Sequence, residues 1–201
     1  MSKEMWDQRY ADEEYVYGTA PNEFFKQELD KLAPGKILLP AEGEGRNAVY
    51  AAENGWDVWA FDQSEEGMKK ALRLASRHNV TIDYHLQDLE TIACPENYYD
   101  AIALVFVHSH HLKRQAIHRN LIRFLKPGGI LILIGYSKEQ LQYGSGGPKE
   151  ESMLFSLDEI SEDFSILKIM SLVKLETQID EGNFHIGKAS VIQLIAANGL
   201  G

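Results

Sequence analysis

The sequence predicts an α/β protein built on a doubly wound, mostly parallel seven-stranded sheet, with helices on both faces and a C-terminal antiparallel hairpin. Residues 36–62 read as strand, glycine turn, helix, strand and acid, the unit with which such sheets begin. Residues 101–107 are apolar throughout, as expected of a central parallel strand buried on both faces. Residues 166–177 and 188–197 read as long strands whose link is too short for a crossover helix, so they must be antiparallel.

Composition indicates one globular domain, because 201 residues with 44% hydrophobic and 25% charged side chains can bury a full core. We expect an arm over residues 1–21, a cofactor-binding core over 22–137, and a substrate-side loop and closing hairpin over 138–201. The lone Cys94 excludes a disulfide framework and sits in a polar loop, where a surface role is favoured over a nucleophilic one.

Net charge and hydropathy limit the classes of binding partner that are expected. A net charge of −10 disfavours nucleic acid, since phosphate backbones repel such a surface. No apolar run approaches the roughly 20 residues that cross a bilayer, and the polar, acidic N-terminus does not read as a secretory signal. We therefore expect a cytoplasmic protein that acts on a small molecule, with no nucleic-acid or membrane partner; the oligomeric state stays open.

The arm is rich in aromatic residues. Trp6 and Tyr10 are four positions apart, so one helical turn would stack them on one face. The arm is either a terminal helix covering the core edge or a lid whose aromatic side chains, with Tyr17, close over a ligand and exclude water.

The first helix is expected to begin at Asn22, a good N-cap residue. Phe25, Leu29 and Leu32 follow at helical spacing and give it one buried stripe. The apolar run 37–39 then forms the first strand.

The glycine turn follows that strand. Gly43 and Gly45 let the backbone turn sharply and lie close to a ligand, because neither carries a Cβ atom. The next helix starts at Arg46 and ends at Asn54-Gly55, where a left-handed C-cap is expected.

An acid stands at the tip of the second strand. Asp62 follows the apolar run 58–61, and a carboxylate there can accept hydrogen bonds from both hydroxyls of a ribose. Strand, helix and acid at these distances predict an adenosine-containing cofactor, although residues 43–48 also fit the G-x-G-x-x-A pattern of a dinucleotide site.

The third strand unit begins with a helix capped by Ser64 and ended by Asn79, and residues 80–86 then read as the strand. Gln87-Asp88-Leu89 stands at the tip of this strand. Asp88 is either a turn residue or helix cap, or it accepts a hydrogen bond from an adenine amino group.

Histidines follow the fourth strand. His108, His110 and His111 could supply a base or substrate contact, bind a metal through H-x-H-H, or simply open the next helix in solvent. His108 is the best candidate for a base because it directly follows the apolar strand. The helix is expected over 112–125, and Lys126-Pro127-Gly128-Gly129 is expected to stop it before a fifth strand at 130–134.

The segment after the fifth strand is expected either to cover the ligand site or to be a simple surface connection between the elements on either side of it. A short helix is predicted over 137–142, then a flexible glycine-rich stretch over 143–148. Ser156 or Ser161 is expected to cap helical turns around 157–164.

Together these parts resemble the class I S-adenosylmethionine-dependent methyltransferases over nearly the whole chain. The Lys126–Gly129 turn is similar to the signature that follows the family's core. Four stretches look more narrowly like the bacterial tellurite-resistance and thiopurine-methyltransferase-like branch, namely residues 6–10, 17–22, 44–48 and 181–187.

The resemblance implies S-adenosyl-L-methionine as cofactor, methyl transfer to a small-molecule nucleophile by in-line displacement, and no metal. It implies that Gly43 and Gly45 line the methionine and ribose, that Asp62 takes the ribose hydroxyls, and that residues 87–89 flank the adenine. The expected cofactor residues are Glu42, Gly43, Gly45, Asn47, Asp62, Gln87, Asp88, Leu89 and Val105. The expected substrate or lid residues are Trp6, Tyr10, Tyr17, His111 and His185, with His108 as the expected catalytic residue.

The chain departs from the family pattern at the turn. Leu39, Ala41 and Glu42 stand where the family has an acid, a glycine and a small residue, so the acid moves from the strand into the turn. That acid suits a cofactor whose sulfonium and ammonium are both positive. Two other functions stay open: an NAD(P)-dependent oxidoreductase, and a non-catalytic binding protein with a degenerate turn.

Overall fold

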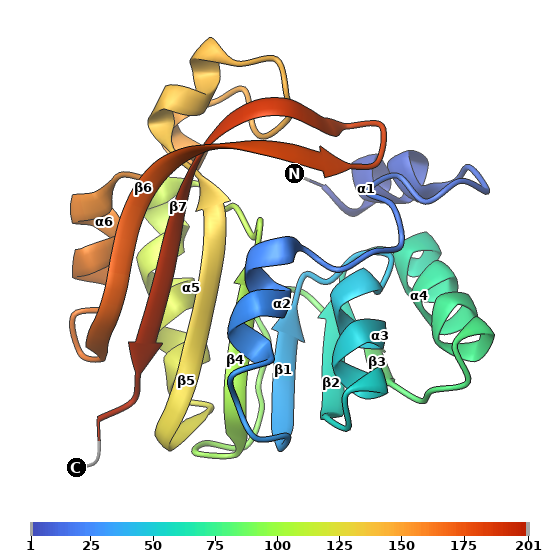
Figure 1. Cartoon of the computed structure of the whole chain (residues 1–201), viewed down its shortest axis with the longest axis horizontal. Coiled ribbons are helices and arrows are strands. Elements are labelled where there is room, and N and C mark those ends of the chain that lie inside the picture. Colours follow the sequence, from blue (N-terminus) through green and yellow to red (C-terminus); the bar gives the residue numbers. More distant parts are fainter. Residues whose placement is uncertain (1, 200–201) are drawn as a thin grey trace.

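In the computed structural model, which describes residues 2–199, one seven-stranded sheet runs through the molecule in the order β3-β2-β1-β4-β5-β7-β6 (Figure 1). Strands β1 to β5 are parallel, whereas β7 is antiparallel to both β5 and β6. The predicted fold class is therefore confirmed. The strands are β1 (Lys36–Pro40), β2 (Asp57–Asp62), β3 (Asp83–Leu86), β4 (Tyr99–Val105), β5 (Leu125–Tyr136), β6 (Lys168–Glu181) and β7 (His185–Ala197).

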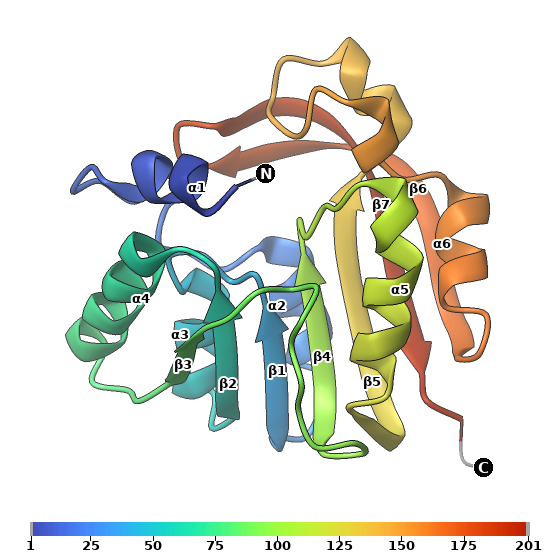
Figure 2. The ribbon, with the colours of Figure 1, turned by 180° about the vertical axis from the view of Figure 1, so that it is seen from behind.

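Helices cover both faces of the sheet (Figures 1 and 2). They are α1 (Lys3–Tyr10), α2 (Glu23–Leu29), α3 (Arg46–Glu53), α4 (Glu65–Arg77), α5 (His111–Ile122) and α6 (Leu157–Asp163), with 3₁₀ turns η1 (Lys138–Gln142) and η2 (Glu151–Met153). Helices α2, α3 and α4 bury Phe25, Val49 and Leu74 against one face. Helices α5 and α6 bury Leu121 and Phe164 against the other.

The order in which strands are added to the sheet reverses between β1 and β4. Strand β1 pairs with β2 on one side and β4 on the other, so the connections leave the two halves of the sheet in opposite directions. A crevice opens outside the carboxyl ends of parallel strands at such a point, which is where ligands bind in this class of fold.

Side chains fix the predicted helix starts. The Asn22 and Ser64 side chains accept hydrogen bonds from the backbone N–H groups of Phe25 (3.0 Å) and Gly67 (3.1 Å). Ser156 forms a capping box with Glu159, so the sequence pattern is confirmed with Ser156, rather than Ser161, as the cap.

Two expected boundaries were wrong. Helix α5 ends at Ile122 rather than Leu125, and the Lys126–Gly129 turn lies inside β5, because Leu125 already pairs with Tyr99. Strand β3 begins at Asp83, three residues later than expected. In both cases tertiary pairing decides the boundary that local propensity left open.

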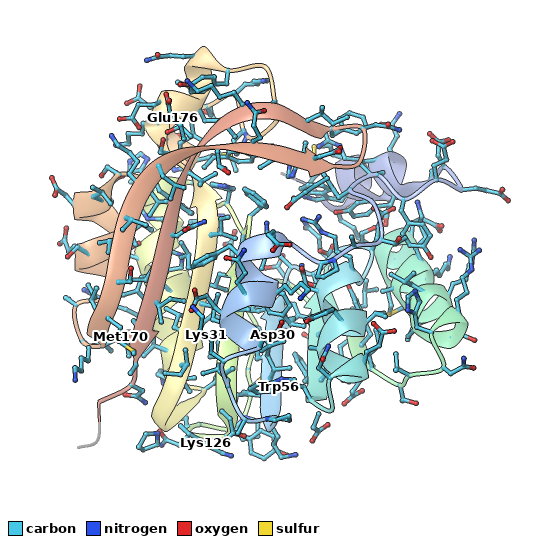
Figure 3. All side chains as sticks on the ribbon, viewed as in Figure 1. Asp30, Lys31, Trp56, Lys126, Met170 and Glu176 are labelled. Atoms are coloured by element: carbon cyan, nitrogen blue, oxygen red, sulfur yellow. The ribbon has the colours of Figure 1, made fainter. Side chains whose placement is uncertain are left out.

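The closing hairpin is longer than the sequence suggested, since only residues 182–184 separate β6 from β7. Its outer half bends over the carboxyl ends of the other strands (Figure 1). Met170 lies near the start of β6 and Glu176 partway along it (Figure 3). The hairpin therefore forms a cover above the crevice. No helix within residues 2–199 has the length and apolar character that crossing a membrane requires.

Candidate cofactor and substrate site

A cavity of about 520 Å³ lies at the carboxyl ends of β1, β2, β4 and β5. Its size falls within the range of about 300–1,000 Å³ that is typical of small-molecule sites. It is covered by what we call the roof: residues 3–18 of the arm, the loop 144–149 and the hairpin turn 181–185. Side chains from all three roof segments line it.

Asp62 lines the cavity from the tip of β2. Its Oδ2 accepts a hydrogen bond from Gly43 N (3.0 Å) and its Oδ1 accepts one from Ser64 N (2.8 Å). A carboxylate offers about four lone-pair sites, so it can also accept a hydrogen bond from a ligand hydroxyl. Burial raises the pKa of Asp62 to about 6, while backbone hydrogen bonds from Ser64, Gly43 and Gln63 lower it.

Glu42 forms the floor of the cavity and caps α3. Its Oε1 accepts hydrogen bonds from the backbone N–H groups of Asn47 and Ala48, both at 2.8 Å, and its Oε2 lies 3.3 Å from Asn47 Nδ2. The carboxylate thus satisfies the free N–H groups at the positive end of the helix. Desolvation raises the pKa of Glu42 to about 7, despite these bonds.

The turn glycines have a different role from the one expected, because neither Gly43 nor Gly45 lines the cavity. A Cβ atom on Gly45 would lie 2.5 Å from that of Ala71, so this glycine lets α3 approach α4. Gly43 holds Asp62 through its N–H group. Ala41, where the family has glycine, takes a positive φ of 50° that glycine would adopt without strain.

The remaining expected cofactor residues gather at the cavity. Asn47, Val105, Gln87, Asp88 and Leu89 all line it. Asp88 also accepts a hydrogen bond from Glu90 N (2.7 Å), so it orders the loop after β3, as the turn interpretation predicted.

The arm lies over this part of the site. Trp6 and Tyr10 stack with ring centroids 5.4 Å apart, as their spacing predicted, and both line the cavity together with Tyr17. Asp7 fixes the arm to the start of α4 by accepting a hydrogen bond from Ser64 Oγ (2.7 Å). Hydrogen bonds from Lys3 and Ser64 lower the pKa of Asp7 to about 2.

The arm also meets the hairpin turn. Directly after the arm, the Nδ2 of Asn22 donates a hydrogen bond to Glu181 Oε1 (2.6 Å). A Cβ atom on Gly182 would lie only 2.3 Å from the carbonyl oxygen of Val16 and 2.6 Å from Gly18 N. The two segments therefore touch backbone to backbone.

His108 lines the cavity, but both of its ring nitrogens are engaged. Nδ1 lies 2.8 Å from the carbonyl oxygen of Met153, and Nε2 accepts the N–H of Tyr136 at 3.0 Å. Burial lowers the pKa of His108 to about 4. The expectation that His108 is a base does not fit this geometry, because no lone pair is left for a substrate proton; His108 instead joins β5 to the segment before α6.

His185 lines the same cavity from the start of β7. Its Nδ1 lies 3.4 Å from Glu181 Oε2, and that oxygen pairs with Arg46 at 2.7 Å. Burial lowers the pKa of His185, whereas Glu181 raises it. Burial alone would raise the pKa of Glu181, but His185 and Arg46 bring it to about 2.

The other two histidines of the H-x-H-H group have different positions relative to the cavity. His110 lines the cavity and begins α5, whereas His111 is exposed and does not line it. Within residues 2–199 no group of three His, Cys, Asp or Glu side chains is placed to hold a metal ion. Cys94 lies away from the cavity, and burial raises the pKa of its thiol.

Sequence reasoning missed several lining residues. Arg9, Arg46 and Tyr136 all line the cavity, and the Tyr136 hydroxyl is buried without a hydrogen-bond partner among the described residues. Signals existed for Arg9 and Arg46, which stand in the quoted stretches 6–10 and 44–48. No local signal marked Tyr136, at the end of β5.

Comparison with known proteins agrees with this geometry. Residues 38–133 match the model of a methyltransferase domain. The ubiquinone biosynthesis O-methyltransferase of Rickettsia akari is 26% identical over 157 residues, which cover 78% of this chain and 61% of that protein. The chain thus spans less than two thirds of that relative's length.

Solved structures share the fold. TehB from Haemophilus influenzae superposes with a TM-score of 0.73 at 18% identity, covering 97% of this chain and 66% of that one. A structure from work on the conversion of a disulfide bond into a thioacetal group during echinomycin biosynthesis gives a TM-score of 0.76 at 16% identity, covering 98% and 92%. The domain match over residues 38–133 and the strand order make this chain similar to the class I S-adenosylmethionine-dependent methyltransferases, and the solved structures, TehB among them, share its fold.

Proposed function

We propose that this chain binds S-adenosylmethionine in the roofed cavity and transfers its methyl group to a small-molecule nucleophile. The observation that carries the proposal is the Glu42 carboxylate on the N-terminus of α3. In a dinucleotide site the pyrophosphate occupies the N-terminus of this helix. Here a built-in anion already holds those N–H groups, which disfavours a phosphate and favours a cation.

The residues around the cavity fit such a cofactor. Asp62 offers free lone pairs for ribose hydroxyls, and residues 87–89 stand beside it at the next strand tip. Glu42, Asp62 and Asp88 place three carboxylates along one wall, which suits a nucleoside with positive charge.

When bound, the cofactor supplies an activated methyl group on a sulfonium. The chain's task is then to align the acceptor, because reacting atoms need to sit about 3–3.5 Å apart. The roof excludes water with the rings of Trp6, Tyr10 and Tyr17. In this proposal residues 22–137 hold the cofactor, while the arm and residues 138–201 enclose the acceptor.

Calorimetry and thermal shift with S-adenosylhomocysteine and NAD test the proposal. Ligand at 100 times its dissociation constant adds about 2.7 kcal/mol of stability, which raises the Tm of a chain of this size by about 5–10 °C. We expect this for S-adenosylhomocysteine and no shift for NAD. A shift with NAD alone would support the oxidoreductase. No response to either ligand would support a binding protein with a degenerate turn.

A further inference from the structure

The His185 imidazole is held on three sides. Its ring centroid lies 4.5 Å from that of Tyr17, 4.9 Å from Phe106 and 5.4 Å from Tyr136. These rings come from the arm, the tip of β4 and the end of β5, so the orientation of the imidazole is set by three separate elements. The side chain is only 7% exposed, yet it lines the cavity.

The two ring nitrogens have different surroundings. Nδ1 faces Glu181, whose carboxylate is fixed in turn by Arg46 (2.7 Å) and Asn22 (2.6 Å). Nε2 forms no hydrogen bond with any of residues 2–199. A carboxylate opposite Nδ1 favours the tautomer in which Nδ1 carries the proton, which leaves the Nε2 lone pair available.

His185 differs in this from the other buried histidines. His108 has both nitrogens engaged, and His118 lies outside the cavity with its Nδ1 2.8 Å from Asp163. His185 combines a place on the cavity wall with a carboxylate partner and a free nitrogen.

We propose that His185 Nε2 accepts the proton that the methyl acceptor loses, and that Glu181 is the positioning residue that holds the imidazole for this step. This inference rests on the function proposed above and adds the class of acceptor: a heteroatom that carries a dissociable proton, as S–H, O–H or N–H.

The step balances in electrons and protons. A lone pair of the acceptor heteroatom forms the bond to the methyl carbon, and the sulfur–methyl bond breaks with its electron pair left on sulfur. The acceptor's proton passes to Nε2, and the resulting imidazolium faces the anionic Glu181. Burial of the neutral imidazole keeps it in the base form at neutral pH.

The first test needs no substrate. The ¹⁵N shifts of the histidine side chains in labelled protein, assigned through His185→Gln, report which nitrogen carries the proton. We expect the Nδ1–H tautomer for His185 at pH 7, and a mixture of tautomers in Glu181→Gln. A dominant Nε2–H tautomer in the parent protein would overturn the proposal.

The second test uses ethanethiol as the probe acceptor and dimethyl sulfide as a nucleophile of the same element without a proton. His185→Gln should lower kcat for ethanethiol by about 10²-fold or more, the contribution expected of a general base, and leave dimethyl sulfide turnover within threefold. Glu181→Gln should lower kcat more than it raises KM. The exposed His111→Gln is the matched control and should match the parent.

Binding of S-adenosylhomocysteine distinguishes a failure of the proposed function from a failure of the proposed role of His185. His185→Gln should bind S-adenosylhomocysteine within about twofold of the parent. A parent protein that fails to bind this ligand would overturn the proposed function itself. Normal binding, with ethanethiol turnover in His185→Gln within threefold of the parent, would overturn only the role of His185.

Discussion

Replacing Glu42 with glutamine tests whether the cavity is built for a cation. The amide oxygen can still accept the N–H groups of Asn47 and Ala48, both of which bond to a single carboxylate oxygen, Oε1. The start of α3 should therefore stay intact while, at pH 8, where Glu42 is mostly ionised, one negative charge leaves the cavity wall. We expect weaker binding of positively charged ligands without loss of the fold.

The magnitude follows from Coulomb's law. At an effective dielectric constant of about 20, unit charges roughly 5–15 Å apart interact by about 1–3 kcal/mol. Glu42→Gln should thus weaken binding of a cofactor analogue with an ammonium group in place of the sulfonium by about 5- to 150-fold. The affinity for S-adenosylhomocysteine, whose sulfur is neutral, should fall by a smaller factor.

The same substitution should change how stability depends on pH. Glu42 has a pKa of about 7 in the folded protein against 4.5 as the reference value, because burial disfavours its charged form. Its neutral form therefore supports folding below about pH 4.5, and this contribution is lost as pH rises through about 7. The difference amounts to about 3 kcal/mol. Glutamine does not titrate, so Glu42→Gln should gain stability relative to the parent between pH 4 and pH 8.

Isothermal titration calorimetry measures the affinities, and urea denaturation at several pH values measures the stabilities. Asp57→Asn is the matched control, since it removes an exposed carboxylate paired with Lys36 at the opposite end of β2. It should change affinity less than twofold. Equal losses for the ammonium analogue and for S-adenosylhomocysteine in Glu42→Gln would refute the electrostatic reasoning.

Three further predictions concern buried charges. Asp62→Ala should weaken the binding of S-adenosylhomocysteine by about 1.5–3 kcal/mol, measured by calorimetry, because hydrogen bonds to a charged acceptor are lost. Unchanged affinity would contradict the assignment of Asp62 to the ribose hydroxyls. Asp163→Ala should lower the free energy of unfolding by about 3–5 kcal/mol in urea, since Arg114 (2.7 Å) and His118 (2.8 Å) would lose their shared buried counter-charge and Arg114 would keep only the more exposed Glu159 at 3.7 Å; a loss below 1 kcal/mol would show that the cluster relaxes. His108 should stay neutral in NMR titration down to about pH 5, and the stability it contributes above pH 6.5 should be lost as pH falls towards 4, because the unfolded chain takes up the proton first; titration near pH 6.5 would contradict its double hydrogen bonding.

Local signals predicted most of the fold. Asn22, Ser64 and the Asn54-Gly55 pair mark helix ends through interactions within a few residues, so their roles can be read directly from the sequence. The apolar run in β4 and the short link between the last strands fixed the sheet type for the same reason. Asp62 was predictable because it directly follows an apolar run and ends the strand β2.

The catalytic side of the site was harder to predict because it depends on contacts between distant segments. His108 follows an apolar strand as a catalytic residue would, but its nitrogens are taken by Met153 and Tyr136, which lie 45 and 28 residues away. The partner of Arg46 is Glu181, 135 residues later. No local pattern encodes such pairs; they follow from the bend that carries the hairpin over the sheet.

The backbone contact of Gly182 with Val16 and Gly18 has a consequence for biosynthesis. The ribosome makes the arm first and the hairpin turn more than 160 residues later. While the chain is still being made, the arm can dock on α4 but not on the hairpin turn, and a ligand entering the crevice would find it open on that side. Enclosure is thus postponed until translation has passed Gly182, and any bulkier residue at this position would keep the two strands of backbone apart.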